Sequence, residues 1–340
     1  MKKSSFALAI LALAAGTASA QSSVTIYGIV DLGLVLDSGA AQGKSVRITS
    51  GAARASRLGF KGIEDLGSGV TAGFTLETGF CADSAAGAPN FCSANNQFMG
   101  REAHGDLSGS FGALSAGRQY TLDYVQFSAV DPFGAGYSGR ANNVIDASAV
   151  RLNNSVRYLT PKMGGFTAGV ELALGETTGN WKANREVGGE VVYSAGPAYA
   201  GLTYYDTSNA NGVGAARKDT LFGATYDFDV VKVHVMAQKS SGAPTGAVRI
   251  DALDLMGGVT VPVAGGSVMA SYLSHNDKSS QNRDASQFGV GYSYPLSKRT
   301  AVYSTFAHID NRHGATFIVG NNTETGTGNK AFDLGVIHRF

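Results

Sequence analysis

The chain has 340 residues, with 27 Lys and Arg, 26 Asp and Glu, 46 Gly and only 7 Pro. This near balance of charge excludes a polybasic nucleic-acid-binding protein. Beyond the first 20 residues no run of 18 apolar residues occurs, so no transmembrane helix is expected, and such a chain could span a membrane only as a closed β-barrel.

The first 20 residues have the pattern of a cleaved secretory signal peptide. Lys2 and Lys3 precede a short apolar run from Phe6 to Ala15, and the small residues up to Ala20 form a cleavage site. We therefore expect a signal peptide at 1–20 and a single mature domain at 21–340. Removing Lys2 and Lys3 from the 27 basic residues leaves 25 against 26 acidic ones, a net charge near −1.

Apolar and polar residues alternate along most of the mature chain, which is the period of a β-strand. In the first such segment Val24, Ile26 and Val30 alternate with Thr25 and Tyr27. The same alternation recurs near residues 57–61, 70–77, 166–174, 222–228 and 288–294. The pattern predicts an all-β protein.

Two kinds of connection alternate between the predicted strands. Seven are short, at about 66–69, 108–110, 163–165, 195–197, 227–229, 263–266 and 296–298. Eight are long and polar, at about 37–54, 82–95, 121–150, 175–186, 206–218, 240–249, 275–285 and 310–328. Fifteen connections predict 16 strands. Short turns at one rim and long loops at the other are typical of an outer-membrane barrel.

The chain has two cysteines, Cys81 and Cys92, and they flank a segment rich in turn residues. In an exported protein such a pair favours a disulfide that closes the loop. Two cysteines do not make a zinc site, and the six histidines are scattered, so we expect no metal and no cofactor.

The last 11 residues form a complete amphipathic strand. Phe332, Leu334, Val336 and Phe340 share one parity, and the opposite face is more polar. Chain ends usually fray, so a strand of this kind at the C-terminus indicates pairing, with the first strand at Val24–Leu36 as the partner.

A β-sandwich is the rival architecture, but a sandwich buries one face of each strand in a core. Here the second face carries Gly, Ser, Thr and charged residues, which a water-filled lumen accommodates. Sixteen strands leave an aqueous channel, whereas eight fill with side chains. We therefore predict a 16-stranded antiparallel transmembrane β-barrel.

Six segments, in order along the mature chain, together with the Phe-terminated last strand, resemble the trimeric general porins of Gram-negative β-proteobacteria. They are Ser22–Gly28, Ser56–Gly67, Leu107–Gly112, Gly117–Tyr120, Asn154–Tyr158 and Tyr294–Thr300. The resemblance implies a homotrimer in the outer membrane that allows passive diffusion of ions and small hydrophilic solutes. It also implies contacts with outer-membrane lipid and lipopolysaccharide.

The resemblance further implies that the third long loop folds into the lumen and narrows it. This loop spans about Thr121–Val150 and carries Asp123, Asp131 and Asp146. The family often has Glu where Asp131 stands. In the family the aromatic C-terminal residue resembles a signal that the barrel-assembly machinery recognises. The resemblance therefore implies this signalling role for Phe340, and simple anchoring at the membrane interface remains its alternative role.

Parity places several basic residues on the lumen face. Arg57 and Lys61 alternate with Leu58 and Phe60, and Arg151 and Arg157 share one parity. Arg101 and Arg118 lie near strand ends, where parity is less clear.

Matching the chain to the family pattern places Arg57, Arg101 and Arg151 in a basic cluster at the constriction. The loop acids would then face this cluster, and an anion preference follows. Two alternatives remain open: each arginine could merely line a wide pore, and the loop acids could fasten the loop to the wall.

Three other functions would each require a feature of their own. A substrate-specific channel for phosphate or an organic anion would need a row of Arg or aromatic residues leading to the constriction. A barrel enzyme would need a Ser/His or Asp/His constellation at one rim, and none is recognisable, so no catalytic residue is expected. A purely structural barrel would conduct no ions.

Overall fold

The computed structural model describes residues 23–84, 97–145, 149–321, 323 and 325–340. The segment 1–20 lies outside these residues, so the signal peptide stays a prediction. The strands are β1 (Ser23–Ala40), β2 (Gly43–Ser50), β3 (Arg57–Gly67), β4 (Val70–Gly79), β5 (Glu102–Gly109), β6 (Gly112–Tyr120), β7 (Arg151–Leu159), β8 (Phe166–Ala173), β9 (Glu186–Ala195), β10 (Ala198–Ser208), β11 (Ala215–Asp227), β12 (Lys232–Gly242), β13 (Ile250–Val263), β14 (Gly266–Asp277), β15 (Ala285–Pro295), β16 (Thr300–Asn311) and β17 (Lys330–Arg339).

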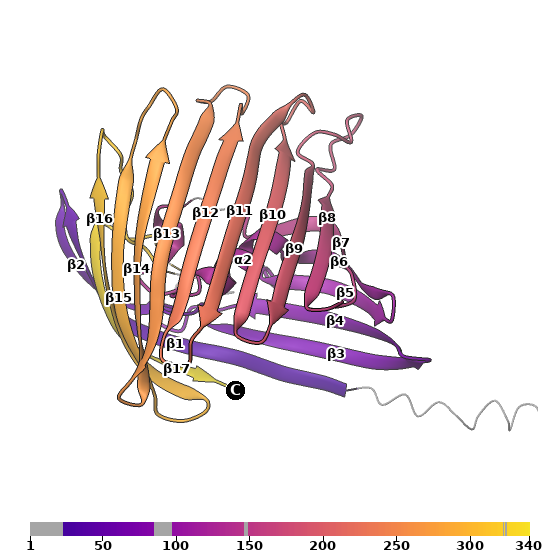
Figure 1. Ribbon diagram of the computed structural model, residues 1–340, viewed down its shortest axis with the longest axis horizontal. Coiled ribbons are helices and arrows are strands. Elements are labelled where there is room, and N and C mark those ends of the chain that lie inside the picture. Colours follow the sequence, from indigo (N-terminus) through magenta and orange to yellow (C-terminus); the bar gives the residue numbers. More distant parts are fainter. Residues whose placement is uncertain (1–22, 85–96, 146–148, 322, 324) are drawn as a thin grey trace, which may run out of the picture.

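The sheet closes on itself through its first and last strands, as the sequence predicted. β1 and β17 pair antiparallel, with Leu34 opposite Leu334. Beyond the last strand, Gly28 and Phe340 exchange two backbone hydrogen bonds of 3.0 and 3.1 Å. All paired strands are antiparallel (Figure 1), and among the described residues only β2 has a single partner strand, β1.

Seventeen strand segments occupy 16 positions in the barrel. β2 pairs with the half of β1 that follows Ile29, and β3 pairs with the half up to Ile29. The two segments thus form one interrupted strand, and the prediction of 16 strands is confirmed.

The prediction of a long loop at 37–54 is wrong. β1 continues to Ala40, and only Ala41 and Gln42 separate it from β2. The segment does alternate, with Val46 and Ile48 exposed on the outer face, but its Gly- and Ala-rich flanks imitate a loop. Residues 51–56 then leave the barrel wall, and Ala52 and Ala53 are fully buried inside it.

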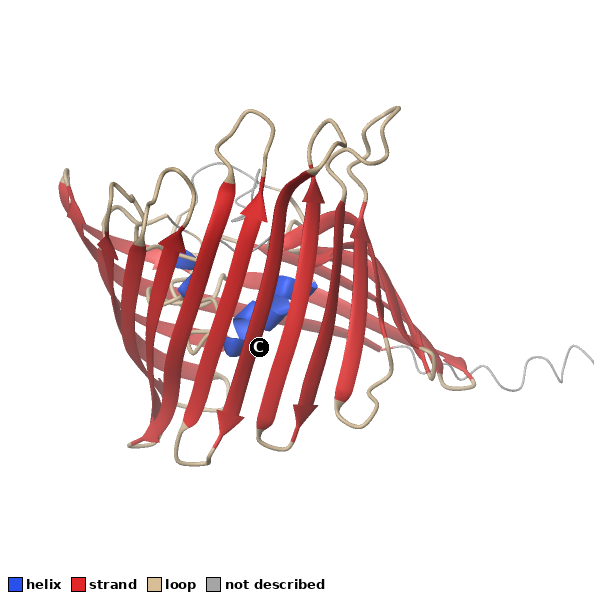
Figure 2. Cartoon of the chain, turned by 45° about the horizontal axis from the view of Figure 1, so that its top comes forward, coloured by secondary structure: helices blue, strands red, loops and turns tan. Residues whose placement is uncertain are grey.

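The seven short turns lie where the sequence placed them, all at one end of the barrel, and the longer connections lie at the other end (Figure 2). Strands β10, β11, β12 and β14 extend into the loops predicted at 206–218, 240–249 and 275–285. Most of the second loop, including Cys92, lies outside the described residues, so the Cys81–Cys92 disulfide stays a prediction.

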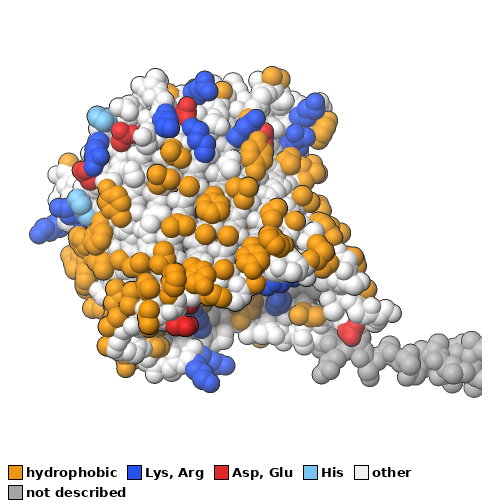
Figure 3. Space-filling view, viewed as in Figure 1, with side chains coloured by type: hydrophobic (Ala, Val, Ile, Leu, Met, Phe, Trp, Pro, Cys, Tyr) orange, Lys and Arg blue, Asp and Glu red, His pale blue; other side chains and the backbone are white. Residues whose placement is uncertain are grey.

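Apolar side chains cover the outer surface and polar ones face inward. On β17, Phe332 and Leu334 are 38% and 51% exposed, whereas Asp333 between them is fully buried. Figure 3 shows the apolar side chains as a band, with most charged residues above it. So large an exposed apolar surface marks contact with lipid or another protein. No helix in the described ranges is long and apolar enough to cross a membrane.

Aromatic rings packed over glycines explain part of the high glycine content. A Cβ atom on Gly335 would lie 2.3 Å from the Tyr303 hydroxyl, and one on Gly188 would lie 2.3 Å from the Tyr205 ring. On the outer face the ring of Phe340 covers Gly28 in the same way, at 2.3 Å. These positions need Gly for space, since a ring occupies the place of a side chain.

The third long loop folds into the lumen, as expected, and carries α2 (Leu122–Val130) and the short η2 (Ala141–Asn143). The Thr121 hydroxyl accepts from the Tyr124 N–H at 3.0 Å and caps α2. On the side of β9 to β12, Gln126 donates to the Gly201 carbonyl at 2.6 Å. One side of the lumen is thereby filled, and the opposite side stays open.

Candidate functional site: a basic constriction in the lumen

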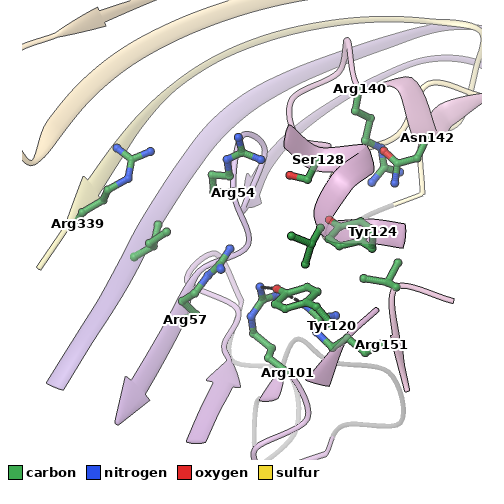
Figure 4. Close-up of a pocket in the computed structure, with 13 residues that line it drawn as sticks. Arg54, Arg57, Arg101, Tyr120, Tyr124, Ser128, Arg140, Asn142, Arg151 and Arg339 are labelled. Carbon is green, nitrogen blue, oxygen red and sulfur yellow. Dashed lines mark hydrogen bonds between the residues drawn. The ribbon is translucent and has the colours of Figure 1, made fainter. Parts of the chain in front are cut away.

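The open side of the lumen narrows to a cavity of about 480 Å³ between the inserted loop and the wall of β1, β3 and β7. Its lining consists of Ile29, Arg54, Arg57, Arg101, Tyr120, Tyr124, Val125, Ser128, Arg140, Asn142, Val150, Arg151 and Arg339. Figure 4 shows Arg54, Arg57 and Arg339 on one side of the cavity and the two tyrosines on the other.

Three of the six lining arginines are those that the family pattern selected. Arg57 begins β3, Arg101 directly precedes β5, and Arg151 begins β7. The structure therefore brings these three side chains together, although they are far apart in sequence.

The other three, Arg54, Arg140 and Arg339, were missed. Arg339 shares the parity of Asp333, so alternation could have found it. Arg54 and Arg140 lie in irregular segments, where no period reports on direction.

Among the described residues that line the cavity, none carries a carboxylate. The ion pairs of the lining arginines, within the described residues, are with Glu77, which lies 2.6 Å from Arg101 Nε and 3.8 Å from an Arg57 nitrogen. Six guanidinium groups thus line the cavity, and among the described residues Glu77 is the carboxylate that forms ion pairs with them. The local charge is strongly positive although the whole chain is nearly neutral.

Tyr120 lies at the centre of this cluster, although no pattern in the sequence indicated it. Its hydroxyl accepts hydrogen bonds from both Arg101 and Arg151. The guanidinium carbon of Arg151 lies 4.0 Å from the Tyr120 ring centroid, within the range of a cation–π contact. Tyr124 stacks on the same ring, with centroids 5.4 Å apart and planes inclined by 8°.

Asp123 and Asp131, the two loop acids within the described residues, do not line the cavity beside the arginines, so for them that expectation is not met. Asp123 is fully buried and accepts from the Thr203 hydroxyl of the barrel wall at 2.6 Å. Asp131 is 3% exposed and accepts from the backbone N–H groups of Phe133, Ala135 and Ala141 at 2.9–3.1 Å.

A buried carboxylate needs donors, and these two find them in the wall and in the loop itself. Burial raises the pKa of Asp131, while its backbone N–H donors and Arg54 act against that rise. The placement fits the alternative in which the acids fasten the loop. Asp146 lies outside the described residues.

Three further predicted residues lie away from the cavity. Arg157 donates to the Tyr120 carbonyl and lies 3.2 Å from Glu171, so its charge is paired. Lys61 lines a separate hollow of about 310 Å³ together with His104 and Asp106.

Arg118 shares the parity of Leu114, which is exposed on the outer face. It donates to Gly100 O at 2.7 Å and Asn153 Oδ1 at 2.6 Å. Its side chain therefore belongs to the wall rather than to the cavity.

The loop tip is held against the rest of the barrel by contacts on several elements. Arg54 donates to the Gly134 carbonyl. The Ser138 N–H donates to Asp333 at 2.9 Å, and Gln287 donates to the Gly139 carbonyl at 3.1 Å. The constriction is therefore built from a fixed loop and a rigid wall.

Within the described ranges, no group of three or more His, Cys, Asp or Glu side chains is arranged to bind a metal ion.

Comparison with known proteins identifies relatives that are described as porins. A model of the family described as Gram-negative porin matches residues 7–314. Outer membrane porin protein 32 of Delftia acidovorans is 35% identical, and the match covers 100% of both chains. An outer membrane porin protein of Bordetella pertussis is 30% identical over 92% of this chain and 95% of its own.

Among solved structures, an anion-selective porin from Comamonas acidovorans has a TM-score of 0.77 and 29% sequence identity. The match covers 94% of this chain and 100% of that porin.

Proposed function

Because this chain belongs to the Gram-negative porin family and is an outer-membrane porin, we propose that its channel conducts ions and small hydrophilic solutes with a preference for anions. The observation that carries the proposal is the cavity lining, whose described residues include six arginines and no carboxylate. Porins are channels rather than enzymes, and a passive role without catalysis is proposed here.

The physical basis of the preference is the charge at the narrowest part of the path. A permeating ion passes close to Arg57, Arg101 and Arg151, which share the single carboxylate of Glu77 among the described ion pairs. The excess positive charge attracts an anion and repels a cation. The anion selectivity of the similar Comamonas porin supports the same preference here.

The proposal includes the assembly of the protein. The segment 1–20 is removed as a signal peptide after export, and the mature chain forms a homotrimer, as in the porins that it resembles. The exposed apolar band supplies surface both for lipid and for neighbouring subunits. Lipopolysaccharide and the barrel-assembly machinery are the further proposed partners, the latter through Phe340.

The direct test is a reversal-potential measurement on the purified protein in a planar bilayer with a tenfold KCl gradient. An anion preference gives a potential of the sign set by chloride. A potential of the opposite sign would overturn the proposed preference, and a barrel without conductance would overturn the channel itself.

The convergence of six arginines on one cavity also favours a second candidate, a channel specific for phosphate or an organic anion. Titration of inorganic phosphate against the KCl conductance separates the two. Block at low phosphate concentration supports the specific channel, whereas conductance that only follows ionic strength supports general diffusion.

A further inference from the structure

We propose that Tyr120 is the positioning residue of the constriction, and that it holds Arg151 in the lumen without reducing its positive charge. The inference rests on the proposed anion preference. It adds a neutral side chain to a site that charge patterns alone had defined.

Arg151 depends on Tyr120 more than the neighbouring arginines do. Within the described residues no carboxylate lies within ion-pair distance of Arg151. Its contacts are the hydrogen bond to the Tyr120 hydroxyl and the 4.0 Å approach to the ring. Arg101 shares the same hydroxyl but is also held by Glu77 at 2.6 Å.

The sheet register brings the two side chains together. Tyr120 is the last residue of β6 and lies directly opposite Arg151, the first residue of β7. Directly opposite residues on antiparallel strands have Cβ atoms about 5 Å apart, close enough for contact. Tyr120 is in turn fixed by Tyr124, stacked at 5.4 Å, and by Arg157, which donates to its carbonyl.

A neutral acceptor is what this position requires. A carboxylate would hold the guanidinium equally well, but its negative charge would cancel the field that a passing ion meets. Arg157 shows that arrangement: it is paired with Glu171 at 3.2 Å and does not line the cavity. A phenol accepts the hydrogen bond and leaves the full charge of Arg151 in the lumen.

The test replaces Tyr120 by Phe, which keeps the ring and removes the hydroxyl. We expect the anion-to-cation permeability ratio, measured at about 0.1 M KCl, to fall about twofold as Arg151 loses its fixed position. Tyr158→Phe is the matched control, because its hydroxyl donates to the Phe111 carbonyl at 2.6 Å, away from the cavity. This control should keep the wild-type ratio.

Salt dependence distinguishes positioning of a charge from a change in loop structure. At 1 M KCl the screening length is about 3 Å, compared with about 10 Å at 0.1 M. The conductance of Tyr120→Phe should therefore match wild type at 1 M. A difference that persists at 1 M would indicate a rearranged loop and would overturn the positioning role.

A double-variant cycle shows whether Tyr120 acts through Arg151. Arg151→Ser alone should lower the ratio, and adding Tyr120→Phe to it should change the ratio little further. If Arg151→Ser leaves the ratio at its wild-type value, the proposed charge-based function fails. If Arg151→Ser lowers the ratio but Tyr120→Phe does not, only the role of Tyr120 fails.

A second variant, Tyr120→Glu, keeps the test decisive if Tyr120→Phe does not fold. Glu supplies an acceptor but adds a negative charge beside Arg151, so the ratio should fall below that of wild type. A wild-type ratio in this variant would overturn the proposal, because it would show that a charged acceptor serves Arg151 as well as the neutral Tyr120 does.

Discussion

Replacing both Arg57 and Arg151 by Ser removes two of the six positive charges around the constriction and leaves the loop contacts in place. Arg151 has no carboxylate within ion-pair distance in the described residues, whereas Arg57 lies 3.8 Å from Glu77. We therefore expect most of the effect to come from Arg151.

The size of the effect follows from Coulomb's law. An ion passing about 5 Å from one guanidinium gains or loses about 0.8 kcal/mol if the surroundings screen as bulk water does. Ions at about 0.1 M reduce this to roughly 0.5 kcal/mol at that distance. Since the change acts with opposite sign on the anion and the cation, the anion-to-cation permeability ratio should fall about fivefold for Arg151, and somewhat more for the double variant.

The assay is the reversal potential across a planar bilayer, measured in KCl gradients of low mean concentration and repeated near 1 M, where the shift should shrink. Arg312→Ser is the matched control, because Arg312 pairs with Asp310 on the exposed rim at 3.0 Å and lies outside the cavity lining. A double variant with the reversal potential of wild type at low salt would refute the assignment of selectivity to these arginines.

Three further predictions concern the loop, the C-terminus and the cysteines. Asp131→Ala leaves three buried N–H groups of the loop tip without their acceptor. The free energy of unfolding should therefore fall by about 1–3 kcal/mol, and the current through the open channel should become noisier. An unchanged melting curve would contradict this role. Deleting Phe340 removes the backbone pair with Gly28 and should reduce the yield of assembled barrels while the channels that do form keep their conductance; full yield with altered conductance would reverse the assignment. Reducing the expected Cys81–Cys92 disulfide should lower the melting temperature of the proposed trimer, and an unchanged value would remove the second loop from the subunit contact.

The barrel could be predicted from the sequence because its two faces meet different solvents. A strand with lipid outside and water inside must alternate, so parity alone gave the directions of Phe332, Leu334 and Val336 and placed Arg57 and Arg151 in the lumen. The missed strand β2 shows the limit of this argument. Its alternating residues, Val46 and Ile48, follow a turn rich in Gly and Ala, and that composition outweighed the pattern.

The inserted loop could not be predicted in the same detail. A helix and an irregular turn inside a lumen are surrounded by protein on one side and water on the other, so no period of two reports which side chain faces the path. Arg140 was missed for that reason, and Asp123 and Asp131 were expected to face the arginines although both are buried. The expectation that Arg118 lines the constriction failed for a different reason. Arg118 lies near the end of its strand, where its outward direction was not recognised.

The distribution of these acids explains how a nearly neutral chain can contain a strongly basic constriction. Asp123 binds Thr203, Asp333 binds the loop backbone at Ser138, and Glu171 pairs with Arg157. Each of these carboxylates is buried in a contact that fastens the loop or its first residues. The cavity is left to arginines, of which Arg151 is held by a neutral tyrosine. The acids therefore fix the geometry, and the charge that ions meet is set by the bases, so net charge carries no information about selectivity.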